Sequence, residues 1–259
     1  MNISACVIVK NEEKHLPRWL DCVKRMAKEL IVVDTGSSDR TVEMAKVAGA
    51  KVFHFPWIHD FAAAKNYAIE QATGDWIVNL DADESFSPED GQKVLALIRR
   101  YHGDRRVGGF MCRCVDIDPE RDNRYLGGHI LLRVFRNHPD LRYEGKIHEL
   151  LRNHGSTPME MKMVPDIEIL HTGYAETVLK EKVQRNLDML MAEQKRRGER
   201  PEDDFYLADC FLGLGEYEKA IRHTRRAIAS GVRLLGMTNH PPLMLIRLLI
   251  LAKRPMAEV

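Results

Sequence analysis

Short apolar runs alternate with amphipathic stretches along the first hundred residues. The apolar runs are rich in β-branched residues and span residues 3–9, 30–33, 52–55 and 76–80. They alternate with stretches that carry apolar residues at helical spacing, residues 16–26, 41–48, 61–72 and 88–101. A regular succession of strand and helix is typical of a parallel sheet with helices on both faces. The sequence therefore predicts an α/β domain with a doubly wound sheet.

The pattern changes after about residue 107. Strand-like segments joined by polar loops follow at residues 109–117, 129–135 and 167–170. Because no helical stretch separates them, we expect an antiparallel extension of the sheet. We expect this extension to carry the binding site of a second, acceptor substrate.

From residue 176 the sequence becomes helical. A stretch over residues 176–197 precedes two short amphipathic helices within residues 204–230, a pair that resembles one tetratricopeptide unit. A single unit cannot bury its apolar face, so we expect residues 176–197 and 243–252 to complete a small bundle, or the chain to continue in a longer parent. The apolar helix near the end of the sequence indicates a truncated repeat or a surface for a protein partner. We predict two domains, residues 1–175 and 176–259.

Composition excludes several classes of protein. The 259 residues include 39 Lys and Arg against 38 Asp and Glu, a net charge of +1 with both signs mixed, so no basic footprint indicates nucleic acid. The longest apolar run, residues 241–252, is interrupted by Arg247 and is shorter than the ~18 residues that cross a bilayer. The first apolar run lacks a basic leader and a cleavage site, which favours a strand over a signal peptide.

The five cysteines are odd in number and scattered along the chain. This pattern argues against a disulfide framework and favours a reducing compartment. We therefore expect a cytoplasmic protein without a transmembrane segment.

Two carboxylates follow the fourth apolar run. Asp81 and Asp83 stand two residues apart, and the two-residue period of a strand would direct both to the same side. Divalent cations such as Mg²⁺ and Mn²⁺ bind oxygen ligands of this kind together with phosphate oxygens. The structural alternative is a polar turn after a strand.

Asp34 closes the second apolar run and is followed by the polar segment GSSDRT. A carboxylate at the end of a buried strand can accept a hydrogen bond from a nucleobase imide or a ribose hydroxyl. Ser38 or Asp39 is equally suited to capping the helix that follows. The chain has no Gly-x-Gly-x-x-Gly or Gly-Lys-Ser/Thr motif, which excludes dinucleotide-binding and P-loop sites.

Taken together, the segments ISACVIVKNEE, LIVVDTGSSDRT and FAAAKNYAIEQATGDWIVNLDADE resemble a family 2 glycosyltransferase. The resemblance covers residues 1–90 densely and implies the GT-A fold, a mixed, Rossmann-like sheet with helices on both faces. The residues that it implies around the nucleoside or nucleotide of the donor are Asn11, Glu12, Asp34, Lys65 and Asn66. Asp81 and Asp83 are implied to hold the sugar nucleotide and its metal.

Three later segments extend the resemblance: HILLRVFRN, YEGKIHE and HTGY. They resemble a bacterial subgroup in which the transferase domain is followed by tetratricopeptide-like helices. Arg133 and Arg136 are candidates for contacts to phosphate or acceptor. Their spacing of three along a strand points them to opposite sides, so we expect one of them in the site and the other at the surface.

The Glu-Asp catalytic motif usual in family 2 is not evident here. Transfer with inversion, which the family implies, needs a carboxylate that deprotonates the acceptor. We predict Glu149 in this role, with Glu84 and Asp116 as reserves; the structural alternative for Glu149 is a surface ion pair. His148 is a candidate metal ligand, acceptor contact or partner that orients Glu149.

His171 ends a predicted strand beside Gly173. With Asp83 it would supply two ligands of a Mn²⁺ or Mg²⁺ ion, and its imidazole favours the softer Mn²⁺. The alternative is a solvated loop residue.

The sequence therefore predicts a metal-dependent, hexosyl-type glycosyltransferase. Its donor is a nucleoside-diphosphate sugar, UDP-linked, and its acceptor is a protein, peptide or glycan. A second hypothesis is a non-catalytic nucleotide-sugar-binding or scaffold protein that acts through its helical repeat; the presence of Asp34, Asp81 and Asp83 argues against it. A nucleotidyltransferase would need a Gly-rich, basic loop after the first strand, where Lys10, Asn11 and Glu12 stand.

Overall fold

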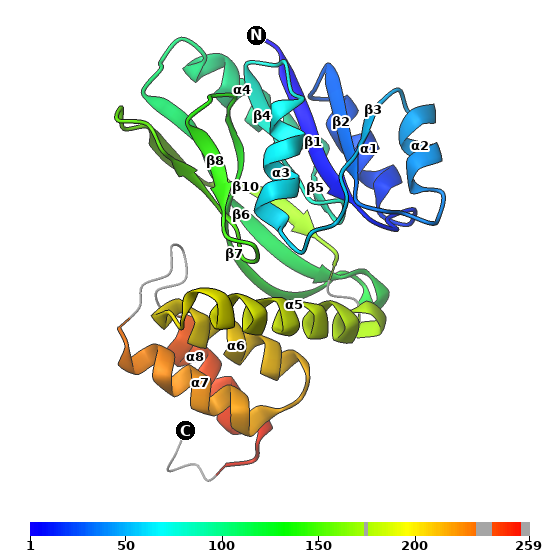
Figure 1. Ribbon diagram of the computed structural model, residues 1–259. Coiled ribbons are helices and arrows are strands. Elements are labelled where there is room, and N and C mark those ends of the chain that lie inside the picture. The colour runs from blue at the N-terminus through cyan, green and yellow to red at the C-terminus, as the bar shows by residue number, and fades with distance from the viewer. Residues whose placement is uncertain (174–175, 232–239, 255–259) are drawn as a thin grey trace. The chain divides into compact units, whose positions relative to one another are not determined.

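The computed structural model describes residues 1–173, 176–231 and 240–254, and the chain divides into two compact units, Met1–Gly173 and Tyr174–Val259 (Figure 1). The helices of the first unit are α1 (Leu16–Lys24), α2 (Thr41–Val47), α3 (Phe61–Glu70), α4 (Pro88–Tyr101) and the short 3₁₀ turn Pro119–Arg121. Its strands are β1 (Ile3–Val9), β2 (Glu29–Asp34), β3 (Lys51–His54), β4 (Trp76–Val78), β5 (Glu84–Phe86), β6 (Val107–Asp118), β7 (Arg124–Arg136), β8 (Leu141–Glu144), β9 (Leu150–Asn153) and β10 (Glu160–His171). The predicted alternation of strand and helix up to Tyr101 is confirmed.

An eight-stranded mixed sheet forms the centre of this first unit (Figure 1), with strand order β3-β2-β1-β4-β7-β6-β10-β5. β1 runs parallel to β2 and β4, and β2 runs parallel to β3. β7 is antiparallel to β4 and β6, while β10 is parallel to β6. β1, β2, β4, β6 and β10 therefore end at one edge of the sheet, which collects the polar residues that follow them.

Side-chain alternation along β1 explains why helices cover both faces. Ala5 and Val7 pack in one core with residues of α1, α2 and α4. Cys6, between them in sequence, packs in a second core with α3 and β8. Successive strand residues point to opposite faces, so an apolar run without alternating polar positions is buried on both sides. The predicted two-faced α/β sheet is confirmed.

The second half of the sheet differs from the sequence prediction. The expected antiparallel extension is present in β7, which is antiparallel to β4 and β6, but β10 pairs with β6 in parallel. Pro165 lies within β10, where the pairing with β6 shifts register between Val164 and Glu168. Proline has no N–H for a ladder hydrogen bond and is tolerated at such bulges. β5, β8 and β9 were not predicted, because strands this short carry no periodic signal.

The second unit is helical where it is described, with α5 (Glu176–Arg197), α6 (Pro201–Gly213), α7 (Tyr217–Ala229) and α8 (His240–Leu251). α6 begins at Pro201, whose fixed φ suits the first helical position, and Glu202 and Asp203 follow in the first turn. Phe205, Ala220 and Leu248 belong to one buried cluster shared by α6, α7 and α8. The two short helices predicted within residues 204–230 thus bury their apolar faces together with α8.

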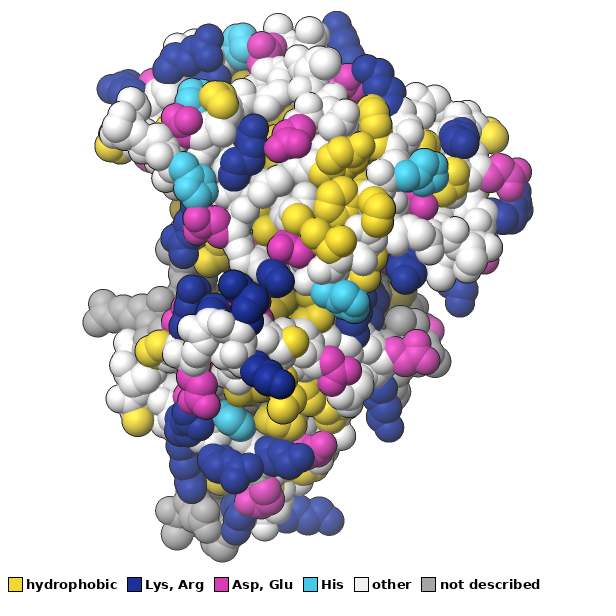
Figure 2. All heavy atoms as spheres, in the orientation of Figure 1, with side chains coloured by type: hydrophobic (Ala, Val, Ile, Leu, Met, Phe, Trp, Pro, Cys, Tyr) yellow, Lys and Arg dark blue, Asp and Glu magenta, His cyan; other side chains and the backbone are white. Residues whose placement is uncertain are grey.

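The distribution of charged side chains on the surface and the free state of the cysteines agree with the expectations from composition. Basic and acidic side chains are both spread over the face shown in Figure 2, whereas apolar side chains gather in a patch on the first unit. All five cysteines are free and buried. Within the described ranges, no helix is both long enough and apolar enough to cross a membrane.

Arg136 anchors α4 to the sheet. Its guanidinium donates to the carbonyl oxygens of Val107 (2.7 Å), Tyr101 (2.6 Å), His102 (2.9 Å) and Asp104 (2.8 Å). It also lies 4.5 Å from the centre of the Trp76 ring. The last carbonyls of a helix lack partners within the helix, and a cation is the favourable partner there. The surface position expected for one of the two arginines is wrong, because Arg136 is buried.

We expect Arg136→Met to lower the free energy of unfolding by about 3 kcal/mol, because buried carbonyls lose a charged donor. Urea unfolding followed by tryptophan fluorescence measures the effect in the first unit alone, since Trp19, Trp57 and Trp76 all lie there. Arg113→Met is the control. Arg113 on β6 is about half exposed and pairs with Glu168, so its loss should cost less than about 1 kcal/mol. Equal effects of the two substitutions would contradict the structural role of Arg136.

Candidate active site

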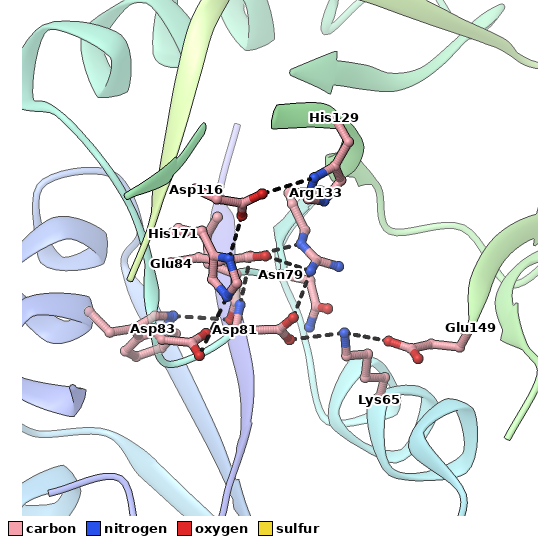
Figure 3. A network of polar contacts seen from close by, with 12 residues as sticks. Lys65, Asn79, Asp81, Asp83, Glu84, Asp116, His129, Arg133, Glu149 and His171 are labelled. Carbon is pink, nitrogen blue, oxygen red and sulfur yellow. Dashed lines mark hydrogen bonds and ion pairs between the residues drawn. The ribbon is translucent and has the colours of Figure 1, made fainter. Parts of the chain in front are cut away.

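Asp81 and Asp83 lie in the turn between β4 and β5 (Figure 3). β4 ends at Val78, so strand periodicity does not set the direction of the two carboxylates. Asp81 points toward Lys65 and Arg133, whereas Asp83 points toward His171. The turn therefore presents two neighbouring carboxylates to two different sets of partners.

Two buried cations hold Asp81. Lys65 Nζ lies 2.9 Å from Oδ1, and Arg133 Nη2 lies 2.6 Å from Oδ2. Burial alone would raise the pKa of Asp81, but Arg133 and Lys65 outweigh it and hold that pKa below its usual range. Burial would likewise lower the pKa of Lys65, yet Asp81 and Glu149 raise it. Asp81, Lys65 and Arg133 are therefore charged at neutral pH.

Glu84 orients Arg133. Its carboxylate accepts two hydrogen bonds from the guanidinium, Nε to Oε2 at 2.8 Å and Nη2 to Oε1 at 2.6 Å. Oε2 also accepts the backbone N–H of Asp81 at 2.9 Å. Glu84 is only 3% exposed. With both oxygens committed to Arg133, it is poorly suited to the reserve role of a general base.

Glu149 reaches the cluster from the loop between β8 and β9. Its Oε1 lies 2.6 Å from Lys65 Nζ, so one ammonium joins Asp81 and Glu149 (Figure 3). The loop turns through Gly145 and His148, with φ of 97° and 54°. His148 directly precedes Glu149 there and is partly buried. The surface ion pair considered as the alternative does not describe Glu149, because its partner Lys65 is buried.

Asn66 fixes α3 to the hairpin. Its side chain accepts the backbone N–H of Tyr143 at 2.8 Å and donates to the Tyr143 carbonyl at 2.9 Å. The N–H of Phe61 donates to the Lys146 carbonyl. An amide side chain matches both backbone groups of a strand residue. The structure thus gives Asn66 a structural contact, and not the expected place in the site, while its neighbour Lys65 faces the carboxylates.

His171 lies between two carboxylates. Its Nδ1 is 2.7 Å from Asp116 Oδ1, and its Nε2 is 3.5 Å from Asp83 Oδ2. Burial alone would lower the pKa of His171, but hydrogen bonds to Asp116 and Asp83 raise it to about 10. Burial would raise the pKa of Asp116, but His129 and His171 lower it to about 2. The solvated-loop alternative for His171 is excluded, because the side chain is 15% exposed.

Gly173 packs directly against Asp83 and His171. A Cβ on Gly173 would lie 2.1 Å from Asp83 Oδ2 and 2.7 Å from His171 Nε2. Only glycine leaves space beside these two atoms. A carboxylate oxygen and an imidazole nitrogen that converge on one small space suit Mn²⁺ or Mg²⁺, with phosphate or water as further ligands. The residues present therefore fit a divalent cation.

A second group of potential ligands lies on the other side of Asp116. Among the described residues, ligand atoms of Cys114, Asp116 and His129 lie within 4.8 Å of one another. Burial raises the pKa of the Cys114 thiol, so it stays protonated, and only a thiolate binds metal well. Asp116 Oδ1 is committed to His171 and Oδ2 lies 3.7 Å from His129 Nδ1. This group is better described as the support of His171 than as a metal centre.

Asp34, Asn11 and Glu12 meet at the ends of β1 and β2. Asp34 is buried and accepts the N–H groups of Gly36 and Ser37 at 3.2 and 3.0 Å. Asn11 Oδ1 accepts the N–H of Ser38, and the Glu12 N–H donates to Thr41. These residues thus line the same edge of the sheet as Asp81.

Sequence reasoning missed several contributors to the cluster. From the sequence, Asp116 is a candidate only as a base, and His129 and Tyr143 stand in motifs without an assigned role. The Tyr143 hydroxyl donates to Asn79 at 3.0 Å, and its ring lies 5.4 Å from Lys65 Nζ. No local sequence signal identifies such residues, because their partners lie on other strands. Arg136, expected as a substrate contact, is bound to the end of α4 and does not join the cluster.

Comparisons with known proteins agree with this architecture. A TPR repeat-containing protein of Synechococcus elongatus is 33% identical over 242 residues, which cover 89% of this chain and 56% of that protein. The SPbeta prophage-derived glycosyltransferase SunS of Bacillus subtilis is 28% identical over 233 residues, which cover 87% of this chain and 53% of SunS. The chain therefore spans about half the length of these curated relatives.

A solved structure of TarS from S. aureus shares the fold, with a TM-score of 0.51 at 13% identity over 96% of this chain and 89% of that one. The family model described as glycosyl transferase family 2 matches residues 4–157, more than half of the sequence. With the two-faced mixed sheet and the carboxylates at its edge, this match shows that the chain belongs to glycosyl transferase family 2.

Proposed function

We propose that the chain transfers a hexosyl group from a nucleoside-diphosphate sugar, UDP-linked, to an acceptor, with inversion and with a divalent cation. Membership of glycosyl transferase family 2 supports sugar transfer. The observation that carries the proposal is the joined set of charged groups at the carboxyl edge. Asp83 faces His171, Asp81 lies in the same turn, and Lys65 connects Asp81 to Glu149.

The ends of β1 and β2 are the proposed nucleoside side of the site. A carboxylate accepts N–H donors, and a uracil imide offers one. Asp34 is suited to this contact because its carboxylate is fixed by two backbone N–H groups. Asn11 and Glu12 would line the same subsite, since Asn11 is hydrogen-bonded to the loop that follows Asp34 and Glu12 to Thr41, where α2 begins after that loop.

Asp83 and His171 would hold the divalent cation, with Asp81 beside them. When bound, the cation supplies positive charge that stabilises the diphosphate as it leaves. Lys65 and Arg133 add two fixed cations on the same side of the site. Because they are already held by Asp81 and Glu84, they need no reorganisation when negative charge develops.

Glu149 is the proposed general base. Lys65 binds its Oε1, so Oε2 is the oxygen that would accept the proton of the acceptor hydroxyl or thiol. The acceptor oxygen or sulfur then attacks the anomeric carbon, and the bond to the diphosphate breaks on the opposite face of the sugar. Lys65 fixes Glu149 while it also binds Asp81, which keeps the base at a constant place relative to the donor side.

The acceptor is proposed to be a protein, peptide or glycan. We propose that the helical domain, residues 176–259, helps to select it, as a tetratricopeptide-like unit would. Five free, buried cysteines support action in a reducing compartment such as the cytoplasm.

Asp83→Ala should weaken Mn²⁺-dependent UDP binding more than about 100-fold and abolish transfer, because a direct ligand is removed. The fold should persist, since the contacts of Thr172 to residue 83 use only its backbone carbonyl. Calorimetric titration with UDP and GDP, each with and without Mn²⁺, measures the effect. Asp21→Ala, an exposed acid on α1, is the control.

Unchanged Mn²⁺-dependent binding in Asp83→Ala would contradict the assignment of this ligand. Absence of any nucleotide binding by the wild-type protein would instead favour the hypothesis of a non-catalytic protein that acts through its helices.

Glu149→Gln should lower turnover by about 10²- to 10⁴-fold while Mn²⁺-dependent UDP binding stays intact, because the amide oxygen can still accept a hydrogen bond from Lys65 but the amide cannot take up a proton. Release of UDP from UDP-hexoses in the presence of peptide and glycan acceptors measures turnover. Glu144→Gln is a matched control, since Glu144 lies on the same hairpin and its side chain is exposed. Turnover of Glu149→Gln near that of the wild type would remove Glu149 as the base.

A further inference from the structure

The pairing of β6 with β10 places Asp116 beside His171. In the parallel pairing of β6 with β10, His171 lies opposite Asp116, and on its other side β5 places Glu84 opposite His171. Asp116 Oδ1 and His171 Nδ1 are 2.7 Å apart. The imidazole is thereby oriented with its other nitrogen, Nε2, toward Asp83 (Figure 3).

The second oxygen of Asp116 faces another histidine. His129 comes from β7, the neighbour of β6 on the side away from β10, and its Nδ1 lies 3.7 Å from Asp116 Oδ2. The carboxylate thus lies between imidazoles from two different strands and is only 8% exposed. Such a group is too enclosed to meet an acceptor, which argues against its reserve role as a base.

We propose that Asp116 is a positioning residue: it holds the Nδ1–H of His171 and so fixes the ring with Nε2 facing Asp83, ready to bind the cation of the donor site. The part of this inference that concerns the cation rests on the proposed function. The part that concerns the orientation of the His171 ring does not. A carboxylate behind a metal-binding imidazole fixes the tautomer and the ring plane, and its loss typically weakens metal binding about 10- to 100-fold. His129 holds Asp116 in turn.

The first test observes the ring without metal. In the full-length protein with ¹⁵N-labelled histidine, the buried, hydrogen-bonded Nδ1–H of His171 should give a slowly exchanging downfield proton signal, identified by its loss in His171→Asn. Asp116→Ala should abolish this signal. Asp116→Asn should retain it at a shifted position, because the amide oxygen still accepts the hydrogen bond. Absence of the signal in the wild type, or its survival in a folded Asp116→Ala variant, would overturn the inference.

The second test measures Mn²⁺ affinity in the presence of UDP, from the electron paramagnetic resonance of free Mn²⁺. Asp116→Ala should weaken binding about 10- to 100-fold, and Asp116→Asn should weaken it less. Asp118→Asn is the matched control on the same strand, because Asp118 is equally buried but accepts the N–H of Glu120; its affinity should equal that of the wild type. Affinity of Asp116→Ala equal to the wild type would overturn the inference.

Two further outcomes distinguish the role of Asp116 from a different metal position and from the absence of a metal. Cys114→Ser should leave Mn²⁺ affinity unchanged, and a clear loss would overturn the inference by placing the cation on the other side of Asp116. A wild-type protein that shows the ring signal but binds no Mn²⁺ would refute the metal in the proposed function, while the orientation of His171 by Asp116 would stand. Tryptophan fluorescence verifies that each variant is folded.

Discussion

The contact between Asp81 and its two buried cations determines how the carboxyl edge of the sheet is built. A charge removed from water must be paired, because breaking such a pair costs about 3 to 5 kcal/mol. Lys65 comes from α3 and Arg133 from β7, so a helix on one face and a central strand must both approach the turn after β4. Glu84 accepts hydrogen bonds from Nε and Nη2 of Arg133, and Glu149 shares Lys65. One set of pairs thus joins the donor and acceptor sides of the site.

The register of β10 is the second constraint. Before Pro165, Val164 lies opposite Cys112; after the irregularity, Glu168 lies opposite Arg113. Continuing the first register would bring Glu168, and not His171, opposite Asp116. The pair would then be two carboxylates, which repel each other across a sheet. The bulge therefore converts a repulsive pair into a hydrogen bond between Asp116 and His171, as expected for an irregularity that aims a side chain.

The sequence predicts the first half of the fold well because each strand and helix there has its own periodic signal. It does not predict β5 or the β8–β9 hairpin, whose strands of three or four residues have too few positions to show a period. Residue chemistry identified Asp81, Asp83, Glu149 and His171, which the structure brings to one network. The family resemblance also implied Asn66, and residue chemistry selected Arg136, but the partners of both are backbone groups that only the folded chain supplies. The contacts of Asp116 and His129 depend on cross-strand pairing, so the sequence does not predict that these residues support His171.

The charge balance of this network differs from that of two ion-pair groups elsewhere in the described residues. Arg113 and Glu168 form a balanced pair, and Arg196 and Arg197 balance Glu193 and Asp203. The network at the sheet edge instead combines two permanent cations, Lys65 and Arg133, and two histidines, His129 and His171, with five carboxylates, Asp81, Asp83, Glu84, Asp116 and Glu149. A site selected for stability alone would not keep uncompensated negative charge in a partly buried place. Local rules of this kind are broken mainly where function requires it. The excess lies where Gly173 leaves space beside Asp83 and His171, so the missing positive charge is best supplied there by a cation that arrives with the diphosphate of the donor.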